Sequence, residues 1–116
     1  LTDRFGCAVL VKGGHGVHDA NDVLALPPTE TADVGAGVRT TWLRSPRVDT
    51  ENTHGTGCTL SSAIACGLAR GLGLEESVAA AKSYLMGALE AGLNLGAGSG
   101  PIDHMWAYRP HQKVSV

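Results

Sequence analysis

One glycine-rich stretch near the middle of the chain holds the residues best suited to chemistry. It covers residues 52–65 and reads NTHGTGCTLSSAIA. Gly55 and Gly57 let the backbone approach a ligand closely, and successive N–H groups in such a turn can point at one anion. The apolar pattern behind them predicts a helix, whose positive N-terminus favours a thiolate at Cys58. The stretch therefore predicts an anion cradle with an activatable thiol, which suits phosphoryl transfer.

The same stretch also has a purely structural interpretation. It could be a tight loop in which Thr56 or Thr59 caps a helix, with Cys58 as a small buried side chain. It is not a Walker loop, because it lacks the widely spaced glycines and the Gly-Lys-Ser/Thr ending of that motif. These residues alone leave both interpretations open, and a second segment upstream favours the chemical one.

The second segment covers residues 7–15 and reads CAVLVKGGH. Its apolar run has the length of a buried strand and ends at Gly13 and Gly14. Ligands of open α/β sheets bind beyond the carboxyl ends of the strands, where Lys12 would emerge as a phosphate clamp. A solvent-facing lysine at a strand end explains this segment equally well.

Together the two segments resemble the hydroxymethylpyrimidine and hydroxymethylpyrimidine-phosphate kinases of thiamine biosynthesis, in the ribokinase-like superfamily. Members of that family carry a strand ending in VKGGH and, further on, NTHGTGCTLSSAIA, and this chain has both in the same order. Residues 98–104 (GSGPIDH) resemble the family's closing Gly-x-Gly-Pro-x-x-His. The similarity spans about residues 8–104 and implies the ribokinase-like three-layer α/β fold, in which such helices pack on a largely parallel sheet.

The resemblance also implies roles for individual residues. Cys58 would be the catalytic base that takes the proton from the attacking hydroxyl, at a position where most ribokinase-like kinases have aspartate. The N–H groups of Gly55, Thr56 and Gly57 would form the anion hole, with Lys12 as a phosphate contact. Further candidates for nucleotide binding are Gly98, Gly100 and Thr53. The implied reaction uses ATP and Mg²⁺ to phosphorylate hydroxymethylpyrimidine and/or its monophosphate, a step in making thiamine diphosphate.

The extent of the resemblance shapes what we expect of the isolated chain. The resemblance implies that kinases of this family have roughly twice this length, and that residues 1–116 match the C-terminal half of their domain, its nucleotide- and phosphate-binding portion. The first strands, most of the pyrimidine pocket and an acidic motif for Mg²⁺ would lie in the other half. We therefore expect this chain to be inactive alone, and to form a homo-oligomer or depend on the missing N-terminal half. We expect the tail after about residue 110 to be loosely ordered.

The composition agrees with one α/β piece of modest size. The 116 residues are 43% apolar and 17% charged, which fits one domain at most. A net charge of −2 and 4% aromatic residues argue against nucleic acid as a partner. Three cysteines, an odd number, argue against a disulfide framework and favour a reducing, cytoplasmic compartment. No stretch approaches 18 apolar residues, so we expect no membrane span.

Apolar periodicity predicts five elements. Strands are expected over residues 6–11, 21–26 and 38–43, with a short extended piece at 47–49. Helices are expected over about 58–72 and 74–91. The predicted buried residues of the first helix are Leu60, Ile64 and Leu68, and those of the second are Val78, Ala81, Leu85, Ala88 and Leu89.

The remaining reactive side chains are weaker candidates. Cys7 and Cys66 are expected to be small core residues. The five histidines form no metal-ligand pattern, so we expect no metal site from them. Asp49 and Glu51 could orient a metal-bound water, and solvated loop acids explain them equally well.

Three classes of function stay open on the sequence. The first is the pyrimidine kinase, with pyridoxal kinase of the same superfamily as its variant, because some such enzymes carry the same Gly-Thr-Gly-Cys loop. The second is a half-domain that binds nucleotide without chemistry. The third is a structural or regulatory interaction domain, against which the intact Lys12 and Cys58 argue, since neither is needed for packing.

Overall fold

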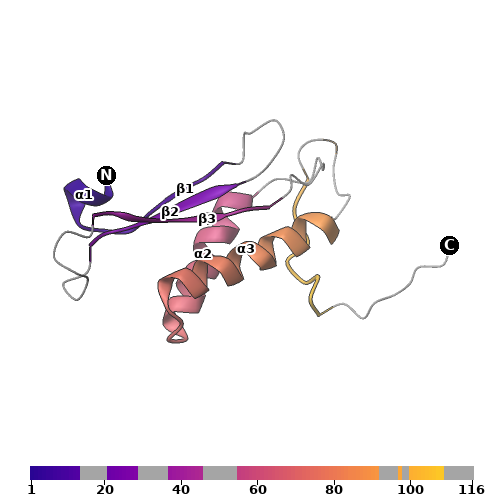
Figure 1. Cartoon of the computed structure of the whole chain (residues 1–116). Coiled ribbons are helices and arrows are strands. Elements are labelled where there is room, and N and C mark those ends of the chain that lie inside the picture. The colour runs from indigo at the N-terminus through magenta and orange to yellow at the C-terminus, as the bar shows by residue number, and fades with distance from the viewer. Residues whose placement is uncertain (14–20, 29–36, 46–54, 92–96, 98–99, 109–116) are drawn as a thin grey trace. The chain divides into compact units, whose positions relative to one another are not determined.

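The computed structural model describes residues 1–13, 21–28, 37–45, 55–91, 97 and 100–108. The chain divides into two compact units, Leu1–Arg47 and Val48–Val116, which we describe separately. The extended piece expected at 47–49 and the tail after 110 lie outside the described residues. The elements, labelled in Figure 1, are α1 (Thr2–Phe5), β1 (Val9–Val11), β2 (Asp22–Leu26), β3 (Arg39–Leu43), α2 (Thr56–Ala69) and α3 (Leu74–Ala91).

The first unit contains a three-stranded sheet in the order β1-β2-β3. Both pairings are antiparallel, with Val11 opposite Val23 and Asp22 opposite Leu43. The largely parallel pairing implied by the family resemblance is therefore absent from these three strands. The connections, residues 12–21 and 27–38, are no longer than about a dozen residues, which is the least that a parallel crossover through a helix needs. Because both pairings are antiparallel, β1 and β3 end at the edge of the sheet where β2 begins.

Strand β2 carries the buried residues of this sheet. Asp22, Leu24 and Leu26 are buried, and the residues between them are half-buried, as expected when side chains alternate between two faces. The predicted strands 21–26 and 38–43 are confirmed to within one residue at each end. The strand predicted over 6–11 is shorter, since β1 begins only at Val9, and the short α1 was not predicted.

Helix α2 begins and ends at glycines in the left-handed conformation. It starts directly after Gly55 (φ 84°), two residues earlier than predicted. At its other end, the N–H of Gly71 (φ 86°) donates to Leu68 O, and that of Leu72 donates to Gly67 O. This pair of bonds is a Schellman motif, which ends the helix at Ala69 rather than at the predicted residue 72.

Small residues bring α2 and α3 close together in the second unit. A Cβ atom added at Gly67 would lie 2.8 Å from Ser77 Oγ and 3.2 Å from Ser77 Cα. The buried face of α2 therefore contains Leu60 and Gly67, and Ile64 is half-buried. The prediction for Leu68 was wrong, since this side chain is 46% exposed. It lies one position beyond the glycine at which the two helices meet, on another side of α2.

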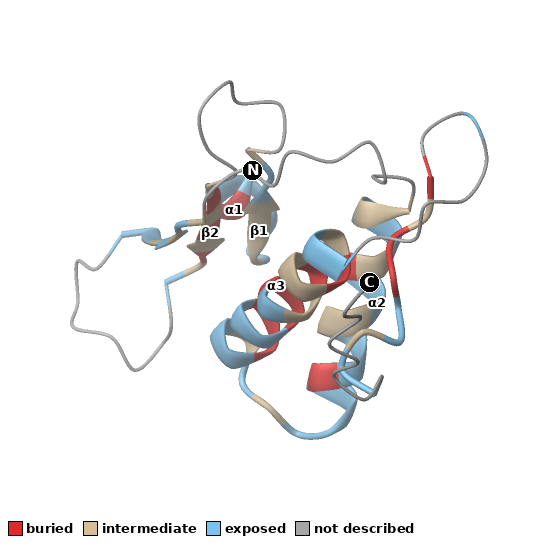
Figure 2. Cartoon of the chain, turned by 90° about the vertical axis from the view of Figure 1, so that its right-hand side faces the viewer, coloured by how far each residue is buried: buried red, intermediate tan, exposed pale blue. Residues whose placement is uncertain are grey.

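The buried stripe of α3 is largely as predicted. Val78, Ala81, Leu85 and Ala88 are buried, and Leu89 is half-buried. Figure 2 shows these buried positions along one side of the helix. The prediction that Cys7 and Cys66 are core residues was wrong, because both are exposed. Cys7 precedes β1, and Cys66 lies next to Gly67 in sequence, about 100° around the helix. Neither long helix is apolar enough to cross a membrane, as far as the described residues show.

Residues 102–106 pack against α3. The N–H of Asp103 donates to Ala88 O (3.1 Å), and Trp106 Nε1 donates to Tyr84 O (3.0 Å). The Trp106 ring lies directly over Gly87, where an added Cβ would come within 2.2 Å of the ring. The segment that follows the Gly98–Gly100 stretch is thus held by the last turns of α3.

Gly87→Ala should destabilise this packing. The new methyl group would displace a ring that its hydrogen bond to Tyr84 holds in place, and such overpacking typically costs about 1–3 kcal/mol. Gly73→Ala is the matched control, because a Cβ atom there meets nothing within 4 Å. Thermal unfolding of the two variants beside the parental protein measures the effect. Equal midpoints for Gly87→Ala and Gly73→Ala would contradict the close contact between Trp106 and α3.

Candidate active site

The N-terminus of α2 presents a row of backbone donors. Its first helical hydrogen bond runs from the N–H of Thr59 to Gly55 O, at 2.9 Å. The N–H groups of Thr56, Gly57 and Cys58 therefore precede the hydrogen-bond ladder of the helix. The first turn contains no acidic residue, so no carboxylate of the helix itself opposes an incoming anion. This geometry suits an oxyanion or a phosphate group.

The side chains of this turn leave its donors accessible. Cys58 is exposed and forms no disulfide. The Ser61 hydroxyl lies 3.1 Å from the carbonyl oxygens of Gly57 and Cys58, so it donates to carbonyls and does not occupy the N–H groups. A Cβ atom at Gly57 would meet nothing within 4 Å among the described residues. Packing within the described chain thus does not require glycine at this position, whereas close approach of a ligand would.

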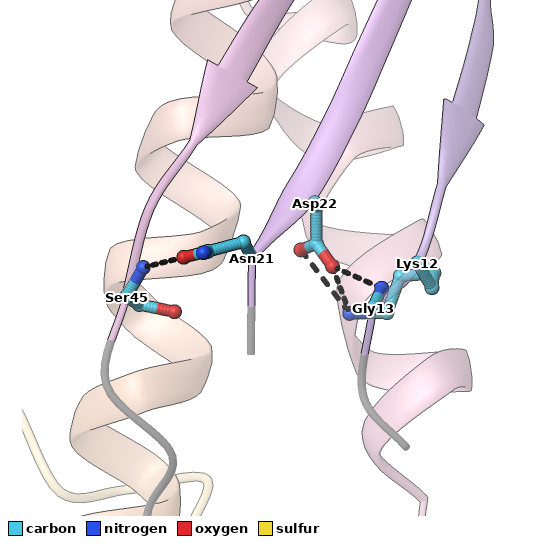
Figure 3. Close-up of polar contacts among 5 residues, drawn as sticks. All are labelled: Lys12, Gly13, Asn21, Asp22 and Ser45. Carbon is cyan, nitrogen blue, oxygen red and sulfur yellow. Dashed lines mark hydrogen bonds and ion pairs between the residues drawn. The ribbon is translucent and has the colours of Figure 1, made fainter. Parts of the chain in front are cut away.

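A second polar cluster lies where β1 ends and β2 begins (Figure 3). Lys12 Nζ lies 3.3 and 3.5 Å from the two carboxylate oxygens of Asp22. The N–H of Gly13 donates to Asp22 Oδ1 at 2.9 Å. The Asp22 side chain is 1% exposed, whereas that of Lys12 is 43% exposed. The Lys12 side chain is therefore anchored to a buried charge while part of it is accessible to solvent.

The neighbouring residue Asn21 ties the third strand to the same edge. Its Oδ1 atom accepts a hydrogen bond from the N–H of Ser45, just beyond the end of β3, at 3.0 Å. The backbone of Gly13 passes so close that a Cβ atom there would lie 1.9 Å from Asn21 O. Gly13 is therefore required by close approach of two backbone segments.

Sequence reasoning missed Asn21 and Asp22. A signal was present, because Asn and Asp are depleted in strands, and here they stand at the start of an otherwise apolar one. Their importance depends on the antiparallel pairing, which places them beside Lys12 and Ser45.

The structure describes only part of the predicted site. Lys12 lies in the first unit, and Gly55, Thr56, Gly57 and Cys58 lie together in the second. Gly100 is buried, and His104 is exposed. The predicted residues outside the described part of the chain are Thr53, Gly98, His15, His18, His54, His111, Asp49 and Glu51. No group of three or more His, Cys, Asp or Glu side chains suited to a metal ion occurs among the residues that are described.

Comparison with known proteins identifies the family. A family model described as phosphomethylpyrimidine kinase matches residues 1–103. The chain belongs to this family. It is 51% identical over 98 residues to the hydroxymethylpyrimidine/phosphomethylpyrimidine kinase of Streptomyces coelicolor, covering 84% of this chain and 33% of that protein. It is 47% identical over 100 residues to the kinase of the same name from Rhizobium meliloti, covering 84% and 34%. The chain thus spans about a third of these relatives.

Solved structures of pyridoxal kinases have a similar fold. An ADP complex of the Bacillus subtilis pyridoxal kinase matches with a TM-score of 0.72 at 31% identity, over 87% of this chain and 36% of that one. The Staphylococcus aureus pyridoxal kinase in complex with AMP-PCP matches with a TM-score of 0.71 at 26% identity, over 88% and 34%. The predicted ribokinase-like α/β fold, with part of the sheet and its helices, is confirmed.

The two ends of α2 allow a direct test of whether the first turn of this helix activates the Cys58 thiol. Cys58 lies in the first turn and Cys66 in the last, and both thiols are exposed. Negative charge is favoured at a helix N-terminus and disfavoured at its C-terminus, and the thiolate is the reactive form. Iodoacetamide at neutral pH should therefore alkylate Cys58 faster than Cys66, as measured by peptide mass spectrometry. Equal rates would show that the start of α2 does not activate its thiol.

Proposed function

We propose that this chain is the nucleotide- and phosphate-binding C-terminal part of a kinase that phosphorylates hydroxymethylpyrimidine and/or its monophosphate with ATP. The product would serve thiamine diphosphate biosynthesis in the cytoplasm. The observation that carries the proposal is the first turn of α2, where three backbone N–H groups and the accessible Cys58 thiol lie together. Membership of the phosphomethylpyrimidine kinase family supports the choice of substrate.

The proposed reaction is an in-line displacement at the terminal phosphate of ATP. With hydroxymethylpyrimidine, the substrate hydroxyl oxygen forms a bond to phosphorus, the bond between phosphorus and the ADP oxygen breaks, and ADP leaves; with the monophosphate, a phosphate oxygen of the substrate attacks in place of the hydroxyl. Cys58, as the thiolate, takes the hydroxyl proton and becomes a thiol. The N–H groups of Gly55, Thr56, Gly57 and Cys58 stabilise the negative charge on the transferred group. Lys12 contributes a compact positive charge near the phosphates.

The described residues do not supply every part of such an enzyme. Among them no group of three or more metal-ligating side chains occurs, so we assign no Mg²⁺ ligand to the described residues. The remainder of a complete kinase would hold the metal and most of the pyrimidine pocket. We therefore propose that the chain is inactive alone, and that it self-associates or depends on an N-terminal partner segment.

A pyridoxal kinase is the second candidate, favoured by the solved structures that match the chain. The same turn of α2 serves both reactions, because both transfer a phosphoryl group to a hydroxymethyl group on an aromatic ring. Competition between hydroxymethylpyrimidine and pyridoxal in the complete enzyme distinguishes them through the ratio of their kcat/KM values.

Cys58→Ala in the complete enzyme should abolish most of the turnover while ATP still binds. The variant loses the proposed base but keeps the backbone donors, so kcat should fall by about 10²–10⁴-fold. Cys66→Ala is the matched control, since it removes another exposed thiol from the other end of the same helix. Steady-state kinetics and ATP titration measure the two effects. A Cys58→Ala enzyme with the parental rate would show that Cys58 is not the base of the reaction.

Lys12→Ala should lower both kcat and kcat/KM, because its charge matters most as negative charge moves toward the leaving oxygen. Lys12→Arg should restore little activity, since a forked guanidinium does not replace a compact ammonium group in a fixed space. Steady-state kinetics at saturating Mg·ATP, with melting curves for each protein, make the comparison. Parental kinetics in Lys12→Ala would leave the phosphate site to α2 alone.

A further inference from the structure

The buried carboxylate of Asp22 has no part in the reaction described so far. We propose that Asp22 is a positioning residue, which fixes the ammonium group of Lys12 at the end of β1 so that it meets the phosphates of the nucleotide. This inference rests on the proposed function of Lys12. It adds a residue that does not itself touch substrate and acts only through its neighbour.

Two contacts of Asp22 bear on the position of Lys12, one with a backbone group and one with the Lys12 side chain itself. The N–H of Gly13 holds Oδ1 at 2.9 Å, which fixes the carboxylate relative to the backbone at the end of β1. Lys12 Nζ then lies within 3.5 Å of both oxygens. An ammonium group has three donor hydrogens. Lys12 can therefore stay bound to Asp22 while its exposed side directs a donor at an anion.

The burial of Asp22 argues against a purely structural role. A fully buried carboxylate loses its hydration, and an ion pair with a half-exposed lysine stabilises a fold only weakly. A neutral side chain could join the same strand ends through hydrogen bonds, as Asn21 does with Ser45. A buried negative charge at this position is explained if its use is to hold a positive charge in one place.

Two substitutions in the complete enzyme separate the two contacts. Asp22→Asn keeps an oxygen that can accept from Gly13 N–H but removes the charge that holds Lys12. We expect its kcat to fall by about 10- to 100-fold, the loss typical of a misplaced catalytic group, with a melting temperature close to the parental value. Asn21→Ala is the matched control, because it removes the hydrogen bond with the N–H of Ser45 at the same sheet edge and leaves both Lys12 and Asp22 unchanged in the sequence. It should lower the melting temperature at least as much as Asp22→Asn, with the smaller loss of kcat.

The Lys12→Ala background shows whether Asp22 acts through Lys12. If it does, adding Asp22→Asn to Lys12→Ala should change kcat by less than about twofold, since residues that act as a unit are strongly non-additive. A full additional loss in the double variant would overturn the inference. So would parental kinetics in Asp22→Asn beside an impaired Lys12→Ala enzyme, or equal kinetic losses in Asp22→Asn and Asn21→Ala.

If the proposed function is wrong, the kinetic results differ from those that would overturn the inference on Asp22. In that case the parental enzyme transfers no phosphate to either ring substrate, or Lys12→Ala keeps the parental kinetics. A crystal structure of Asp22→Asn then judges the geometry without any activity. The inference predicts a displaced Lys12 side chain with the Gly13 backbone unchanged, and an unmoved Lys12 overturns it.

Discussion

The left-handed conformation of Gly55 is the constraint on which the candidate active site depends. It lets the chain enter α2 abruptly, so that the N–H groups of Thr56, Gly57 and Cys58 come before the first helical hydrogen bond. A residue with a Cβ atom would be strained at φ 84°. Because the helix begins there, the Cys58 thiol lies in its first turn, where both the backbone dipoles and solvent reach it. The φ angle of Gly55 thus sets both which N–H groups remain outside the helical hydrogen bonds and where the Cys58 thiol lies.

In the first unit, antiparallel pairing gathers polar and charged side chains at one edge of the sheet. It brings the ends of β1 and β3 to the start of β2, where Asn21 and Asp22 are adjacent. Each of these two side chains binds the end of a different neighbouring strand, one through Ser45 and the other through Gly13. The same residue pair therefore joins three strands and places a buried negative charge beside Lys12. Structural support and control of a functional side chain coincide at this edge.

The packing of the second unit depends on small residues. Gly67 lets α2 approach Ser77 of α3, and Gly87 makes room for the Trp106 ring. The ring and the N–H of Asp103 then fasten the segment after Gly100 to α3. Thin helices thus allow a close pair, and that pair anchors a segment next to the glycines proposed to bind nucleotide. A larger side chain at Gly67 would push α2 away from α3, and one at Gly87 would displace the Trp106 ring and the segment that carries it.

Most of the elements, and the family to which the chain belongs, could be predicted from the sequence alone. Local periodicity and glycine positions were enough to predict β2, β3 and both long helices, and the motifs at Lys12 and Cys58 pointed to the family that comparison confirmed. The antiparallel pairing, the exposure of Cys66 and Leu68, and the contact between Asp22 and Lys12 became known only from the folded chain. The reason is physical: helix and strand periods depend on residues a few positions apart. Register, closest approach and burial depend on distant residues that meet only when the chain is folded.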